Sequence, residues 1–143
     1  MARCKLVAAL LCCGAMVAAP AFSDEDAGNR LSIELNATQS QDDACVLSFL
    51  AQNGHSTDIE TVVFEAVLFN GNGQVDRLTL FDFGTLPTAR PRVRQFVVPN
   101  LQCEGLSRII FNGVSQCTGE GVSEGMCESD LSLTSRTATE VLG

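Results

Sequence analysis

Hydrophobic and polar residues alternate along several short segments of the chain. In residues 31–35 the apolar Leu31, Ile33 and Leu35 are separated by Ser32 and Glu34. Successive side chains of a β-strand point to opposite faces of the sheet, so a period of two predicts a half-buried strand. By the same criterion, further strands are predicted at residues 45–52, 61–70, 75–83, 93–99, 106–114 and 130–137.

The predicted strands are separated by turn signals. Residues 70–73 read NGNG, and these residue types tolerate the positive φ angles of a tight hairpin, so the strand at 61–70 is expected to turn back into the next one. Seven short strands and no convincing helix after residue 21 predict an all-β fold, a two-sheet antiparallel β-sandwich with an immunoglobulin-like strand order as first choice. A jelly roll or a small barrel is the alternative.

Residues 1–21 have the composition of a secretory signal peptide. Arg3 and Lys5 precede an apolar run at residues 6–19, and the small Ala19 and Ala21 suit cleavage before Phe22. A run of about 14 apolar residues is too short to span a membrane as a helix. We therefore expect a flexible acidic segment at residues 22–29, a single β-sandwich domain at residues 30–143, no stable membrane insertion, and a periplasmic or secreted location.

The chain is acidic, which bears on its partners. It has 17 Asp and Glu against 9 Lys and Arg, a formal net charge of −8, and loss of Arg3 and Lys5 with the signal peptide would leave 7 − 17 = −10. A negative chain repels a phosphate backbone, so nucleic acid is not an expected partner. No cofactor is expected, and a protein partner in the periplasm is the remaining candidate.

Four of the seven cysteines lie beyond the signal peptide: Cys45, Cys103, Cys117 and Cys127. An even number in an exported chain predicts two disulfides. Of three possible pairings, Cys45–Cys103 with Cys117–Cys127 is favoured, because the second pair brackets one glycine-rich loop, TGEGVSEGM, and leaves the first pair to join distant strands. A zinc site is the rival interpretation, but no CxxC spacing supports it, and no metal site is expected.

The segment RPRVRQFVVPN, residues 90–100, carries three arginines at alternate positions of a predicted strand. Alternation places Arg92, Arg94 and Phe96 on one face of that strand. If this face is exposed, it forms a docking stripe; if it faces the core, Arg94 is pressed toward the interior and needs a carboxylate. The candidate partners for internal pairing on neighbouring strands are Glu65, Asp76 and Asp82.

The docking hypothesis combines these arginines with the strand at 61–70, which is apolar on both faces. Guanidinium groups bind carboxylates and other anions bidentately, and apolar neighbours add contact area. The predicted binding residues are Arg92, Arg94, Phe96, Val63, Val67 and Phe69.

The only histidine, His55, lies in the turn-like segment NGHSTD, beside the serine, threonine and aspartate of the sole triad-like cluster. Adjacent residues of one loop need not face each other as a nucleophile and its base must, and His55 is expected to be solvated. GxSxG, GxGxxG, Walker and CxxC motifs are all lacking. The predicted function is a non-catalytic exported interaction or structural module of the cell envelope; a small envelope hydrolase centred on His55 is the alternative.

A resemblance adds to this interpretation. The run at residues 67–103, VLFNGNGQVDRLTLFDFGTLPTARPRVRQFVVPNLQC, together with the downstream SRIIFNG and the two later cysteines, resembles a family of small, uncharacterised exported proteins of alphaproteobacteria. The resemblance implies export and carries no catalytic residue over to this chain.

Overall fold

Every predicted strand is present, and an eighth follows them. The elements are β1 (Leu31–Gln41), β2 (Ala44–Asn53), β3 (Ile59–Asn70), β4 (Val75–Leu86), β5 (Arg92–Pro99), the 3-10 turn η1 (Cys103–Gly105), β6 (Leu106–Thr118), β7 (Ser132–Ser135) and β8 (Glu140–Leu142). The computed structural model describes residues 28–143, so the predicted signal peptide at 1–21 and residues 22–27 of the predicted acidic segment lie outside the described residues.

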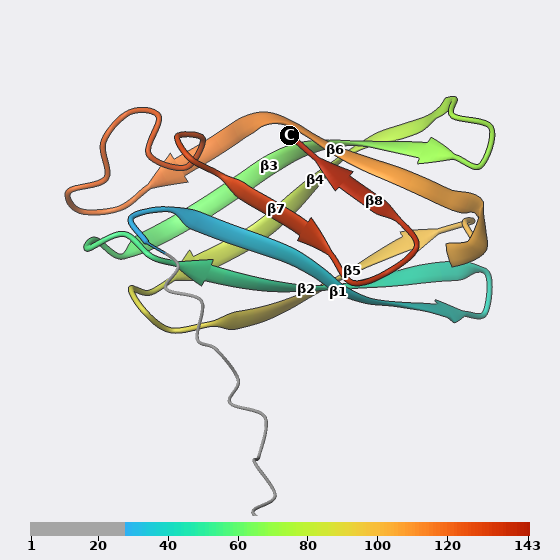
Figure 1. Cartoon of the computed structure of the whole chain (residues 1–143), viewed down its shortest axis with the longest axis horizontal. Helices are drawn as coiled ribbons and strands as arrows, with labels where there is room; N and C mark the ends of the chain where they lie inside the picture. The colour runs from blue at the N-terminus through green and yellow to red at the C-terminus, as the bar shows by residue number, and fades with distance from the viewer. Residues whose placement is uncertain (1–27) are drawn as a thin grey trace, which may run out of the picture.

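The strands form two four-stranded sheets packed face to face, which confirms the predicted β-sandwich (Figure 1). One sheet has the order β5-β2-β1-β7 and the other β4-β3-β6-β8. The first six strands follow the immunoglobulin order: β1, β2 and β5 share one sheet, β3 and β6 share the other, and β4 lies beside β3 as an added strand does in variable-type domains.

The C-terminal strands depart from the antiparallel expectation. β7 pairs parallel to β1, and β8 pairs parallel to β6. The turn between them carries the chain from one sheet to the other: the Arg136 N–H donates to the Leu35 carbonyl at 2.9 Å, and the Thr139 hydroxyl donates to the Leu106 carbonyl at 3.0 Å. One side of the sandwich is therefore formed by β7 and β8, and the opposite side by the edge strands β4 and β5.

An aromatic cluster fills the space between the sheets. Phe49 of β2 is fully buried, with ring centroids 5.5 Å from Phe81, 5.7 Å from Phe83 and 6.1 Å from Phe111. Most of these ring pairs are tilted or edge-to-face, the geometry that the quadrupoles of aromatic rings favour. The rings come from both sheets, so burial of the cluster holds the two layers together.

Both disulfides form with the predicted pairing. Cys45 at the start of β2 bonds to Cys103 in η1, and Cys117 near the end of β6 bonds to Cys127 in the loop that follows. The first bond ties the start of β2 to the 3-10 turn that precedes β6, and the second closes the glycine-rich loop. Two disulfides indicate an oxidising, extracytoplasmic environment.

Candidate functional site

The face of β5 that carries the arginines turns toward the opposing sheet. Phe96 stacks on Phe81 with centroids 4.6 Å apart, and Val98 is buried. Arg94 follows the same face inward: its Nε donates to the Phe83 carbonyl at 2.7 Å and its Nη2 donates to the Thr85 carbonyl at 3.0 Å. Arg94 is therefore used internally, but its partners are backbone carbonyls, two on β4 and that of its neighbour Val93, and not the carboxylates considered from the sequence.

Arg77 makes the reciprocal contact from β4. Its Nη1 donates to the Pro99 carbonyl of β5 at 2.7 Å, while its Nε pairs with Asp76 at 2.6 Å. Arg92 donates only to the carbonyl of its neighbour Pro91, at 3.1 Å, among the described residues. The two edge strands are thus tied to each other by arginines, which occupy carbonyls that a further strand could otherwise use.

The six residues proposed for binding do not meet on one surface. Phe96 packs against the core, and Val63 is only 8% exposed. Val67 and Phe69 are half-buried on the outer face of the β4-β3-β6-β8 sheet, whereas Arg92 and Arg94 lie on the other sheet. An exposed stripe of Arg92, Arg94 and Phe96 is consequently absent, because burial of the Phe96 ring decides which face of β5 points inward.

The outer face of the β4-β3-β6-β8 sheet does carry exposed apolar residues. Register places Val67 of β3 opposite Leu78 of β4 on one side and Ile110 of β6 on the other, and Ile110 opposite Leu142 of β8. We call these four residues the apolar row. Leu78 is 72% exposed and Leu142 42%, and Leu80 extends the exposed surface along β4.

Charged residues border the apolar row. Arg108 lies 6.0 Å from the centroid of the Phe69 ring and pairs with Glu140 at 2.6 Å. Sequence reasoning included Val67 and Phe69 because both faces of their strand are apolar, but it missed Leu78, Ile110 and Leu142. Leu78 and Leu80 at alternate positions of residues 75–83 were the available signal.

His55 is buried, with 7% of its surface exposed, so the expectation of a solvated histidine was wrong. The Asn53 side chain organises this loop: its Oδ1 accepts the His55 N–H at 3.0 Å, and its Nδ2 donates to the Leu86 carbonyl at 2.9 Å. The His55 Nδ1 lies 3.3 Å from the Asn29 Oδ1, and its Nε2 has no partner among the described residues.

The triad-like cluster is not assembled around His55. The Asp58 carboxylate accepts the Thr88 N–H at 2.7 Å, and this hydrogen bond lowers the pKa of Asp58 below its ordinary value. Asp58 therefore holds the chain between β4 and β5. Within residues 28–143, His55 makes no hydrogen bond to Ser56, Thr57 or Asp58, and no three histidine, cysteine or acidic residues come together as metal ligands would.

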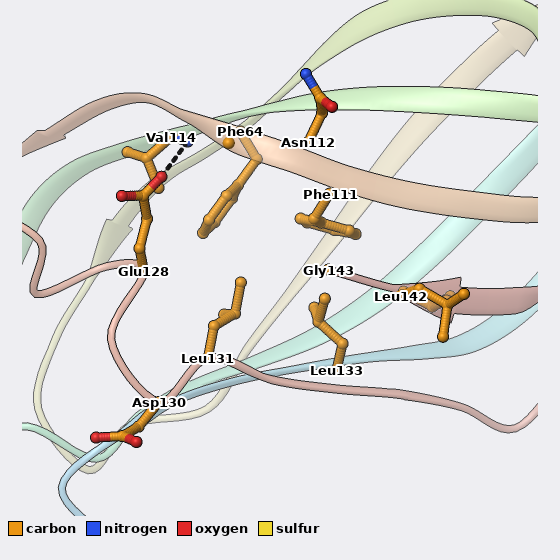
Figure 2. Close-up of a pocket in the computed structure, with 12 residues that line it drawn as sticks. Phe64, Phe111, Asn112, Val114, Glu128, Asp130, Leu131, Leu133, Leu142 and Gly143 are labelled. Atoms are coloured by element: carbon orange, nitrogen blue, oxygen red, sulfur yellow. Dashed lines mark hydrogen bonds between the residues drawn. The ribbon is translucent and has the colours of Figure 1, made fainter.

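A cleft of about 550 Å³ opens between β6 and the segment around β7 (Figure 2). The Phe64 and Phe111 rings point into it from one sheet, and Leu131 and Leu133 point toward them from the other side. Glu128 lies at one end of the cleft and Asp130 at its lower rim in the view of Figure 2. This site was not predicted, because its walls come from segments that only the fold brings together.

Comparison of the chain with protein-family models, curated proteins and solved structures found no match. In the part of the chain that the structure describes, no helix has the length and apolar character needed to cross a bilayer.

Proposed function

We propose that this protein is an exported, non-catalytic interaction module that binds a protein partner through the outer face of its β4-β3-β6-β8 sheet. The observation that carries the proposal is the apolar row, in which Leu78, Val67, Ile110 and Leu142 lie side by side across all four strands. Contiguous exposed apolar surface bordered by polar residues is typical of protein interaction sites.

Export is supported by two independent features. Residues 1–21 have the composition of a signal peptide, and both disulfides require an oxidising compartment. We therefore place the working protein in the periplasm or the secreted fraction, as the resemblance to exported alphaproteobacterial proteins also implies.

The partner is expected to combine an apolar patch with basic surroundings. The chain carries a formal net charge of −8, or −10 without residues 1–21, so association with a second acidic protein is opposed by long-range repulsion. A basic partner would instead be attracted, and its apolar patch would cover Leu78 and its neighbours.

The test compares two double variants with matched exposure. Leu78→Ser with Leu80→Ser, at 72% and 57% exposed, removes apolar surface from the proposed face, whereas Val93→Ser with Val97→Ser removes residues of similar exposure, at 63% and 64%, from the other sheet. Each protein is immobilised with its disulfides formed and exposed to periplasmic extract, and a retained protein is then purified and its affinity measured directly by calorimetry.

The proposal expects one partner that binds wild type and the β5 control alike and binds the β4 variant at least tenfold more weakly. Equal binding to all three proteins would contradict it, as would selective loss with the β5 control. Retention of nothing beyond background would favour a structural envelope protein without a ligand.

A further inference from the structure

The cleft of Figure 2 exists because β8 covers only part of β6. β3 pairs with β6 from Leu106 to Thr118, but β8 pairs only with Arg108–Ile110. From Phe111 onward, the side of β6 that faces away from β3 has no strand partner among residues 28–143. An unpaired strand margin is a template for addition of another extended segment.

A side chain already binds a backbone N–H on this unpaired side of β6. The Glu128 Oε1 accepts the Val114 N–H at 3.1 Å, so a carboxylate stands where the carbonyl of a neighbouring strand would otherwise accept that hydrogen. Figure 2 shows Glu128 reaching up to β6 from the loop before β7. The backbone of β6 is therefore available to a ligand that offers its own acceptor in place of Glu128.

The walls of the cleft suit an apolar side chain. Phe64 and Phe111 belong to the buried core, and Leu131 and Leu133 are half-buried across from them. The volume of about 550 Å³ lies within the range of roughly 300–1,000 Å³ that is usual for ligand pockets. An apolar side chain inserted here would extend the aromatic core outward.

The charge of the rim selects the occupant. Glu128 and Asp130 both line the cleft, and neither forms an ion pair with a described residue. A basic group next to the apolar side chain would complement them. The chain's own segment at residues 22–27, FSDEDA, carries three acidic residues and no basic one, so the rim disfavours it.

We propose that this cleft binds an extended segment of a protein partner in which an apolar residue and an arginine or lysine stand two positions apart, on the same face, and that the segment adds as a strand beside β6 where β8 stops. This goes beyond the function proposed above, because the two charges that select the segment, Glu128 and Asp130, are not members of the apolar row. Leu142 borders both sites, so the variants that separate them change Glu128 and Asp130 in one and Leu78 and Leu80 in the other.

The probe is the labelled, end-capped peptide Thr-Ser-Leu-Thr-Arg-Ser-Thr, compared with the same peptide carrying glutamate in place of arginine. Binding is measured by fluorescence anisotropy with the disulfide-bonded protein, and the site is located by backbone amide shifts in NMR. The decisive variant is Glu128→Gln with Asp130→Asn, which removes both charges, keeps an acceptor for the Val114 N–H, and places asparagine where Asp130 has a φ of 57°.

The arginine peptide is expected to bind more tightly than the glutamate peptide and to shift amides of residues 111–114. The charge variant should weaken its binding about fivefold and reduce its salt dependence, since two rim-exposed charge contacts together contribute about 1 kcal/mol. Leu78→Ser with Leu80→Ser serves as the control and should leave this affinity unchanged.

Three results would overturn the inference: no binding of the arginine peptide, equal affinity for both peptides, or an affinity that the charge variant leaves unchanged. Amide shifts confined to β4 would also overturn it, because they would place the peptide on the apolar row. If no partner depends on Leu78 and Leu80 while the peptide still binds, only the outer-face proposal is contradicted.

Discussion

Arg94 of β5 donates its Nε hydrogen to the carbonyl oxygen of Phe83 on β4 at 2.7 Å, on the side of the sandwich that the edge strands β4 and β5 form. The same guanidinium reaches the Thr85 carbonyl, so one side chain connects the edges of both sheets. This contact explains why an acidic chain keeps an arginine on the inward face of a strand.

Arg94→Ala is expected to lower the free energy of unfolding by about 1–2 kcal/mol, because two charge-assisted hydrogen bonds between the sheets are lost at a partly exposed site. The measurement is urea unfolding followed by circular dichroism. Arg92→Ala is the control, since Arg92 donates only to its neighbour Pro91 in the described structure, and it should change stability by less than about 0.5 kcal/mol. Equal effects of the two substitutions would show that the bridge to β4 is not stabilising.

The two disulfides should differ in their contribution to stability. They close loops with sequence separations of 58 and 10, for which chain entropy predicts roughly 4 and roughly 3 kcal/mol. Replacing Cys45 and Cys103 together by alanine should therefore cost more than replacing Cys117 and Cys127. Guanidinium unfolding of both double variants decides the order, and the reverse order would count against loop entropy as the main term.

Phe81→Ala is expected to cost about 3–5 kcal/mol, because the ring is buried and stacks on Phe96. Phe69→Ala, on the outer face, should cost about 1 kcal/mol, since only a half-buried ring and its contact with Arg108 are lost. The comparison uses thermal melting of both variants. If Phe69→Ala lowered stability more than Phe81→Ala, the outer face would contribute more to stability than the aromatic cluster between the sheets.

The hydrogen bond that Asp58 accepts should make the stability of the folded protein sensitive to acid. The hydrogen bond from Thr88 lowers the pKa of Asp58 in the folded state below its ordinary value of 3.8, so the stabilisation is present above that value and is lost as the pH falls through the lowered folded pKa. Asp58→Asn should therefore lose less stability than wild type as the pH falls below about 4.

The control for this experiment is Asp43→Asn, an exposed carboxyl with no side-chain hydrogen bond in residues 28–143. Melting temperatures of wild type and both variants between pH 2 and about pH 6 provide the measurement, over the range in which carboxylates titrate. If the melting temperatures of wild type and Asp58→Asn fall equally as the pH is lowered, Asp58 does not contribute to acid sensitivity.

The positions of the strands and the cysteine pairing were predictable because each depends on local or covalent properties. Period-two alternation is set by the geometry of an extended backbone, and the loop between Cys117 and Cys127 is short enough to favour its own closure. β8 was missed because three residues, Glu140–Leu142, are too few to show a period, and their pairing with β6 depends on the fold.

The candidate sites were less accessible to sequence reasoning. Val67 could be assigned to an outer face, but its neighbours Leu78 and Ile110 are 11 and 43 residues away along the chain and meet it only through strand register. His55 was assigned to solvent because its loop is polar, yet Asn53 folds that loop inward by bonding to the Leu86 carbonyl. Long-range hydrogen bonds decided both cases.

The sequence alone determined a disulfide-fastened sandwich of short strands, because alternation and cysteine number are properties of the chain itself. Only the tertiary structure decided which face of β5 is buried. Both faces of β5 carry apolar residues, with Val93 and Val97 on one and Phe96 and Val98 on the other, so alternation left the choice open. The Phe96 face of β5 points inward because the Phe96 ring packs against the rings of Phe49, Phe81 and Phe83. The smaller Val93 and Val97 side chains would bury less apolar surface against these rings.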